Sequence, residues 1–102
     1  MKDLAWESAD DATTTNADDH VILIAGDLVG TARTAAFAFA KAGNHIVVAS
    51  DDDEAAVRLT AELRARNVDA TYVHADTHND REIQRLIDLT VQHYGHLDIE
   101  YR

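Results

Sequence analysis

Short runs of apolar, mostly β-branched residues alternate along this sequence with longer segments of helical character. The runs at residues 21–25 and 46–49 contain no polar residue, which is typical of strands that are buried on both faces. Residues 70–75 form a third, weaker run, and residues 97–99 begin a fourth. Because a helical stretch separates each pair of runs, the order βαβαβαβ predicts an α/β fold with one parallel sheet and helices on both of its faces.

Capping residues delimit the three helical segments. The first covers about residues 31–42, and the second begins at the acids of residues 51–54, which suit the positive end of a helix dipole. The third begins at Asn79, where Glu82 stands three residues further on as in a capping box, and Gly95 ends it. Apolar residues recur along this third helix at spacings of three and four. They are Ile83, Leu86, Ile87, Thr90, Val91 and Tyr94.

Composition limits the class of protein and its partners. The 102 residues fit one small domain, and 19 acidic against nine basic residues give a formal charge of −10. A surface this negative repels phosphate backbones and anionic lipids, so we expect neither nucleic acid nor a membrane as partner. The longest uninterrupted apolar run, residues 35–40, is too short for a membrane span. The absence of cysteine excludes disulfides, and the lack of a secretory signal pattern predicts a cytoplasmic location.

The first 19 residues differ from the rest of the chain. They contain one basic residue, Lys2, and only Leu4 and Trp6 could anchor them to a core. Their acidic residues are Asp3, Glu7, Asp10, Asp11, Asp18 and Asp19. This composition predicts a disordered acidic leader over residues 1–19, although Trp6 leaves a docking arm as the alternative.

A glycine loop follows the first strand and precedes the first helix. Gly26 and Gly30 lie in this loop, between a buried run and an alanine-rich segment that begins at Thr31. In such a loop, backbone N–H groups point outward at the helix N-terminus, and small residues let a pyrophosphate approach closely. The placement therefore predicts an anion-binding site.

At this point the sequence resembles the N-terminal half of a short-chain dehydrogenase/reductase, over about residues 20–99. The loop of that family reads Thr-Gly-x-x-x-Gly-x-Gly; Gly26 and Gly30 match its first two glycines, and Ala32 stands at the third. Further motifs agree in order and spacing. The segment at residues 94–99 is similar to the Phe-Gly-x-Leu-Asp-Ile stretch of the family.

The resemblance implies a partial NAD(P)-binding Rossmann domain over residues 20–102, with about four strands in the order 3-2-1-4. The cofactor-binding residues that it implies follow the first three strands. They are Gly26, Leu28, Val29, Gly30, Thr31, Ser50, Asp51, Asp76 and Thr77. The loop residues would hold the pyrophosphate, Ser50 and Asp51 the ribose, and Asp76 would lie near the adenine. The acids from Asp51 onward disfavour a 2′-phosphate, so NAD is favoured while NADP stays open.

The loop also departs from the family's pattern. Asp27 places a carboxylate inside a loop that would hold an anion. At an effective dielectric constant of about 20 and a separation of about 6 Å, this repulsion costs roughly 2–3 kcal/mol before solvent screening. Leu28 and Val29 lack the hydroxyl groups that often help to hold phosphates. We therefore expect weak dinucleotide binding.

The catalytic residues that the family resemblance implies are absent from this sequence. The family uses a Tyr-x-x-x-Lys pair, but Tyr72 and Tyr94 are followed four residues later by aspartate, and Tyr101 is next to last. No catalytic residue is assigned, and the abrupt loss of similarity after Ile99 is typical of a truncated or frameshifted reading frame. Whether the chain is an enzyme stays open.

Two functions follow from these observations. The first is an NAD(P)-binding fragment of an oxidoreductase, inactive alone. The second is a non-enzymatic remnant or protein-interaction module that binds no nucleotide. With a fourth strand at the sheet edge and apolar residues such as Leu86 and Val91 near the exposed side of their helix, we expect a homodimer, a complex with an intact relative or a partly molten monomer.

One further cluster contains residue types that bind metals. His74, Asp76 and His78 alternate, so an extended segment would present them on one side, where imidazoles suit zinc or nickel. No fourth ligand is evident from the spacing, so we expect no metal and interpret Asp76 as part of the nucleotide site.

Overall fold

The computed structural model describes residues 20–26, 28, 30–41 and 43–102. Four strands form its single sheet: β1 (Val21–Ala25), β2 (His45–Ser50), β3 (Asp69–His74) and β4 (Ile99–Tyr101). Three helices connect them: α1 (Thr31–Ala38), α2 (Asp53–Arg64) and α3 (Asp80–Tyr94). The acidic leader predicted over residues 1–19, with Trp6, lies outside the described residues.

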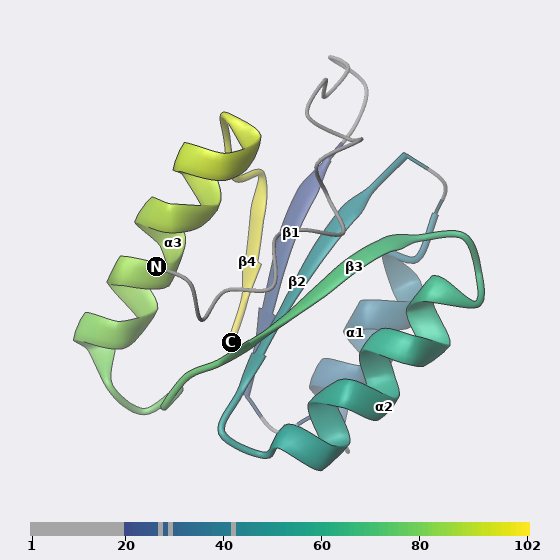
Figure 1. Ribbon diagram of the computed structural model, residues 1–102, viewed down its shortest axis with the longest axis horizontal. Coiled ribbons are helices and arrows are strands. Elements are labelled where there is room, and N and C mark those ends of the chain that lie inside the picture. The colour runs from purple at the N-terminus through teal and green to yellow at the C-terminus, as the bar shows by residue number, and fades with distance from the viewer. Residues whose placement is uncertain (1–19, 27, 29, 42) are drawn as a thin grey trace.

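All strand pairs are parallel, and the strand order is β3-β2-β1-β4. The predicted α/β Rossmann-like fold with strand order 3-2-1-4 is thereby confirmed. Helices α1 and α2 cover one face of the sheet and α3 covers the other (Figure 1). The chain therefore leaves β1 toward one face and leaves β3 toward the opposite face.

The core consists of two layers that share the sheet. In β1, Val21 and Leu23 face the α3 layer, while Ile22 and Ile24 face the layer of α1 and α2. All four side chains are fully buried. Burial on both faces explains why the run contains no polar residue, since alternate residues of a strand point to opposite faces.

The boundaries of four elements differ from the predicted ones. Helix α1 ends at Ala38, because the carbonyl of Phe39 accepts hydrogen bonds from the Lys41 N–H at 2.8 Å and the Asn44 side-chain amide at 3.0 Å. Strand β4 begins at Ile99, two residues later than predicted. Strand β3 begins and ends one residue earlier than predicted, and β2 is one residue longer at each end.

The predicted start of α3 is confirmed in part. The Asn79 Oδ1 accepts hydrogen bonds from the N–H groups of Arg81 at 3.0 Å and Glu82 at 3.3 Å. The Glu82 carboxylate does not complete the capping box at Asn79; it accepts a hydrogen bond from the Asp76 N–H at 2.9 Å. Gly95 ends the helix as predicted, with a φ of 93° that favours glycine.

One expectation about α3 is wrong. Leu86 is 3% exposed and packs into the core between α3 and the sheet, whereas Val91 is 40% exposed. Leu86 therefore does not lie on the exposed side of the helix.

None of the helices in the described part of the chain combines the length and the apolar character that a membrane span needs.

Candidate functional site

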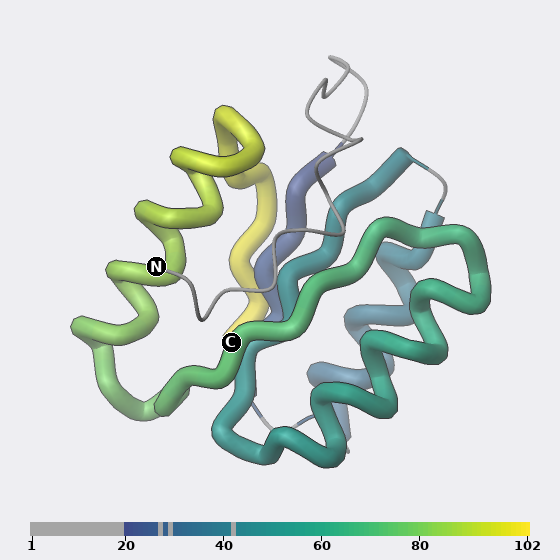
Figure 2. Tube along the Cα trace, viewed as in Figure 1, coloured from purple at the N-terminus to yellow at the C-terminus, as the bar shows by residue number. Residues whose placement is uncertain are grey.

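The loops that follow β1, β2 and β3 meet at one edge of the sheet. Because the strands are parallel, their carboxyl ends share that edge, and Figure 2 shows the chain leaving all three strands there. A cavity of about 280 Å³ lies between the loops. Its lining residues come from all three: Gly26, Leu28, Ser50, Asp51, Asp52, Thr77 and His78.

The structure brings most of the sequence-predicted site residues to this edge. Those that line the cavity are Gly26, Leu28, Ser50, Asp51 and Thr77. Gly30 and Thr31 form the start of α1, where the Gly30 carbonyl accepts hydrogen bonds from the N–H groups of Arg33 and Thr34. Asp76 precedes the lining residue Thr77. Val29 and Asp27 lie outside the described residues.

The glycine loop leaves open space beside its backbone. Gly26 has a φ of 126°, a conformation that side chains with a Cβ rarely adopt. A Cβ placed at Gly26 or Gly30 would meet no heavy atom within 4 Å. Leu28 is 4% exposed and packs into the core layer that contains α1 and α2. A buried leucine thus anchors the loop, and the two glycines leave its backbone accessible to a ligand.

Three consecutive acids form an acidic rim, defined here as Asp51, Asp52 and Asp53. Asp52 is the N-cap of α2, where its Oδ1 accepts a hydrogen bond from the Ala55 N–H at 3.1 Å. The Ser50 Oγ accepts a hydrogen bond from the Asp52 N–H at 3.0 Å, which fixes the turn out of β2. Asp51 is exposed, and its carboxylate forms no hydrogen bond or ion pair within the described part of the chain.

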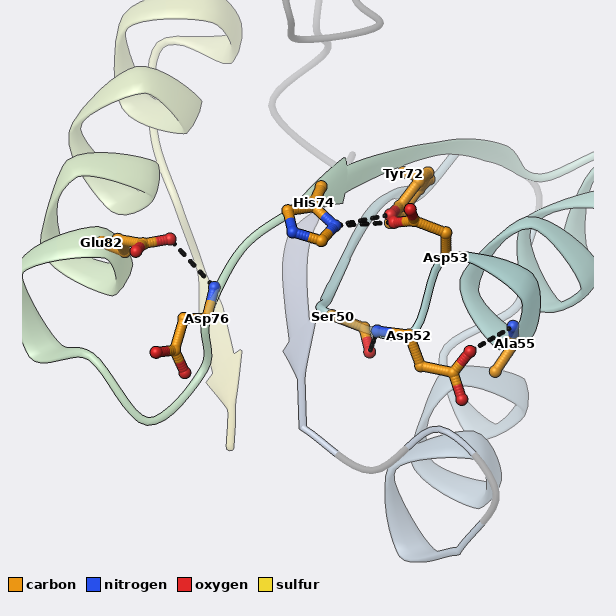
Figure 3. A network of polar contacts seen from close by, with 8 residues as sticks. All are labelled: Ser50, Asp52, Asp53, Ala55, Tyr72, His74, Asp76 and Glu82. Carbon is orange, nitrogen blue, oxygen red and sulfur yellow. Dashed lines mark hydrogen bonds and ion pairs between the residues drawn. The ribbon is translucent and has the colours of Figure 1, made fainter.

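The third acid of the rim is paired with a histidine. The His74 Nδ1 lies 2.7 Å from the Asp53 Oδ1 and 3.4 Å from the Tyr72 hydroxyl (Figure 3). The hydrogen bond to Asp53 raises the pKa of His74 above its usual value, and the charges of Asp53, Asp51 and Glu82 raise this pKa further. The imidazolium form of His74 is therefore favoured at this edge.

Hydrogen bonds also fix the loop after β3. The Asp76 Oδ1 accepts from the His78 N–H at 3.0 Å, and the Asp76 carbonyl accepts from the Asn79 N–H at 3.0 Å. The Asp76 N–H donates to Glu82, on the first turn of α3. Asp76 thus supports a tight turn, and the following residues Thr77 and His78 face the cavity.

The predicted alternation of His74, Asp76 and His78 does not produce a cluster. His74 contacts Asp53 on α2, and the Asp76 carboxylate accepts from the His78 backbone. Within the described ranges, no group of three or more histidine, cysteine or acidic side chains could hold a metal ion.

Sequence reasoning missed two residues that line the cavity, Asp52 and His78. Asp52 directly follows Asp51, so its position at the carboxyl end of β2 was a usable signal. His78 precedes the helix cap Asn79, which places it at the same edge. Recognising it required the turn at Asp76 to be known.

Comparisons with known proteins agree with this architecture. The family model described as short chain dehydrogenase matches residues 20–100. A short chain aldehyde dehydrogenase 1 of Euphorbia lathyris is 32% identical over 91 residues, covering 89% of this chain and 31% of that protein. An A-factor type gamma-butyrolactone 1′-reductase of Streptomyces virginiae is 32% identical over 83 residues, covering 81% and 32% respectively.

Solved structures show the same similarity. A short chain dehydrogenase/reductase from Burkholderia phymatum, in complex with NAD, aligns with a TM-score of 0.71 and 28% identity over 81% of this chain and 30% of that one. An alcohol dehydrogenase from Thermococcus sibiricus, complexed with 5-hydroxy-NADP, aligns with a TM-score of 0.69 at 19% identity, over 81% of this chain and 36% of that one. The chain spans about a third of the length of the curated relatives it matches.

Proposed function

The chain belongs to the short chain dehydrogenase family, and from that premise we propose that it binds a nicotinamide dinucleotide in the cavity between its three loops. The observation that carries the proposal is the meeting of an open glycine loop, a strand end with polar residues and the turn at Asp76 around one cavity. The crevice lies at the carboxyl ends of parallel strands, where the chain continues toward opposite faces of the sheet. A crevice in this position of an α/β fold suits a nucleotide.

The residues of each loop have separate roles in this proposal. The pyrophosphate lies against the loop of Gly26, Leu28, Val29, Gly30 and Thr31, where the N-terminus of α1 offers unpaired N–H groups. Ser50 and Asp51 face the adenosine ribose. Asp76 and Thr77 lie near the adenine. The dinucleotide, when bound, supplies the hydride-transferring ring that the chain itself lacks.

The acidic rim favours NAD over NADP. Asp52 is engaged in capping α2 and Asp53 in pairing with His74, which leaves the Asp51 carboxylate able to accept hydrogen bonds from a ribose diol. The same carboxylate repels a 2′-phosphate. The proposed order of affinity is therefore NAD above NADP, and Asp51 is the residue that sets it.

Catalysis by these 102 residues alone is not proposed. The sequence contains no Tyr-x-x-x-Lys pair, and none of its three tyrosines lines the cavity. The site therefore lacks the proton donor that the family resemblance implies, a tyrosine whose pKa a lysine lowers. The purified chain, mixed with NADH or NADPH and a panel of carbonyl compounds, should give no turnover above background.

Calorimetric titration with NAD⁺ and NADP⁺ tests the proposal. We expect binding of NAD⁺ that is weak, because Asp27 and the rim are acidic, and still weaker binding of NADP⁺. Gly30→Val should abolish binding of both nucleotides. Asp51→Asn should reduce the difference in affinity between NAD⁺ and NADP⁺. Asp88→Asn, an exposed acid on α3, is the matched charge control. Asp27→Ser should tighten binding by up to about 1–2 kcal/mol.

The alternative function gives the opposite result. A protein-interaction module that binds no nucleotide gives no heat with either compound while circular dichroism shows a folded chain. That outcome, or binding that Gly30→Val leaves intact, would reject the proposed site.

A further inference from the structure

His74 lies beside the proposed ribose position, although it belongs to a different strand. Its Cα is the register partner of Ser50, and neighbouring strands are about 4.8 Å apart. Ser50 and His74 fall at alternate positions with the residues that face α1 and α2, so their side chains share that face of the sheet. The 2.7 Å contact with Asp53 holds the imidazole against the acidic rim (Figure 3).

The charges that act on His74 come from α2, from the turn that precedes it and from α3. Asp53 on α2 forms the direct contact, and Asp51, in the turn between β2 and α2, acts on it through space. Glu82 acts from α3, and the uncharged Tyr72 hydroxyl lies 3.4 Å away on β3 itself. His74 therefore lies among acids, at the edge where an anionic dinucleotide would enter.

We propose that His74 regulates dinucleotide affinity through pH, since its imidazolium offsets the charge of Asp53 in the acidic rim. This inference rests on the proposed function. His74 is a positioning and charge-compensating residue, not a catalytic one, because it does not line the cavity. When His74 is protonated, the Asp53–His74 pair is neutral. When His74 loses its proton, Asp53 adds a full negative charge to the rim.

The sign of the effect follows from these charges. The pyrophosphate of NAD⁺ keeps the same charge over the range in which histidine titrates, so only the protein's charge changes. Affinity is highest below the raised pKa of His74 and falls as the pH increases through it. His74 and Asp53 are both exposed, so the change is about twofold to fivefold at low ionic strength and smaller in salt.

The test measures NAD⁺ affinity of the 102-residue chain by calorimetry from about pH 5.5 to about pH 8.5, a range that spans the ordinary histidine pKa. Nuclear magnetic resonance follows the His74 imidazole over the same range. We expect the NAD⁺ affinity and the His74 imidazole signal to change with the same midpoint pH. His74→Gln should still bind NAD⁺, with a flat pH profile at the wild-type high-pH affinity. Asp53→Asn should bind more tightly at high pH, with both midpoints moved to lower pH.

Two further histidines serve as controls. His20→Gln changes a histidine that directly precedes β1, at the amino ends of the strands and away from the cavity. The wild-type pH profile of NAD⁺ affinity should therefore persist. His78 lines the cavity and is the competing source of pH dependence. If His78→Gln removes the pH dependence and His74→Gln retains it, the inference is wrong. A flat wild-type profile with measurable NAD⁺ binding rejects this inference alone, whereas no binding at any pH rejects the proposed function with it.

Discussion

The Asn79 side chain secures the point at which the chain passes from the cavity into α3. Its Oδ1 accepts hydrogen bonds from two N–H groups that have no partner within the helix, those of Arg81 and Glu82. The Asn79 N–H in turn donates to the Asp76 carbonyl. The cap of α3 and the turn of the candidate site are therefore one hydrogen-bonded unit.

Asn79→Ala should reduce the free energy of unfolding by about 1 kcal/mol, since alanine cannot accept these two hydrogen bonds. Urea denaturation followed by circular dichroism measures the loss. Gln84→Ala, an exposed residue on the same helix whose amide contacts Asp88, is the control and should cost about 0.2–0.5 kcal/mol. Equal losses for the two variants would contradict the capping role.

At the scale of an element, α3 shows how one apolar stripe divides in the folded chain. Ile83, Leu86, Thr90 and Tyr94 are buried, and Val91 is 40% exposed. All of them recur at helical spacing, yet the stripe is wider than the face that contacts the sheet. Val91 lies at the margin of that face.

Leu86→Ala should lower the free energy of unfolding by about 2–5 kcal/mol, because it leaves a cavity between α3 and the sheet. Val91→Ala, on the same helix, should change it by no more than about 0.5 kcal/mol. Urea denaturation of both variants checks the contrast. A large loss in Val91→Ala would mean that a partner or a second copy covers this residue in solution.

At the scale of the whole molecule, two histidines couple folding to pH in opposite directions. Burial lowers the pKa of His93, whose ring lies 4.7 Å from that of Tyr94 in an edge-on arrangement. The hydrogen bond to Asp53 raises the pKa of His74. Burial therefore favours neutral His93 in the folded state, and Asp53 favours charged His74.

These directions predict how two variants change the acid sensitivity of folding. His93 gives stability above its unfolded pKa that is lost as the pH falls through its lower folded pKa, so His93→Gln should lose less stability on acidification. His74 gives stability below its unfolded pKa that is lost as the pH rises through its raised folded pKa, so His74→Gln should lose more. Urea denaturation from about pH 7.5 to about pH 5.5 measures both slopes. Slopes equal to that of the wild type would contradict the assignments.

The sheet also predicts association of the 102-residue chain. Among the described residues, β3 and β4 are edge strands, and β4 pairs with β1 through only three residues. Unpaired edge groups and a small core favour a homodimer, a complex with a longer relative or a partly molten monomer. Sedimentation equilibrium combined with amide exchange distinguishes these three outcomes. Raised salt should strengthen association, because it screens the charge of −10. A monomer with protected amides throughout residues 20–99 would reject this prediction.

Local patterns in the sequence determined the elements and their order. The apolar runs of β1 and β2, the Asn79 cap and the Gly95 stop each act within a few residues, so they can be recognised without knowledge of the fold. The order of strands followed from the family resemblance and from the alternation of strand and helix. The assignment of Gly26, Ser50 and Asp51 to one nucleotide site followed from the family resemblance, and it agrees with the rule that parallel strands bring their carboxyl ends together.

Only the tertiary structure decided which contacts each of several similar residues makes and which of them are buried. Asp51, Asp52 and Asp53 are identical and exposed neighbours, yet Asp52 caps α2 and Asp53 pairs with His74, 21 positions further along the chain, whereas the Asp51 carboxylate has no such contact within the described part of the chain. Likewise, Leu86 is buried and Val91 is not, although both belong to one helical stripe. Periodicity reports which way a side chain points from its own element. Its contacts depend on the packing of elements that are distant in sequence, and that packing is set by the core as a whole.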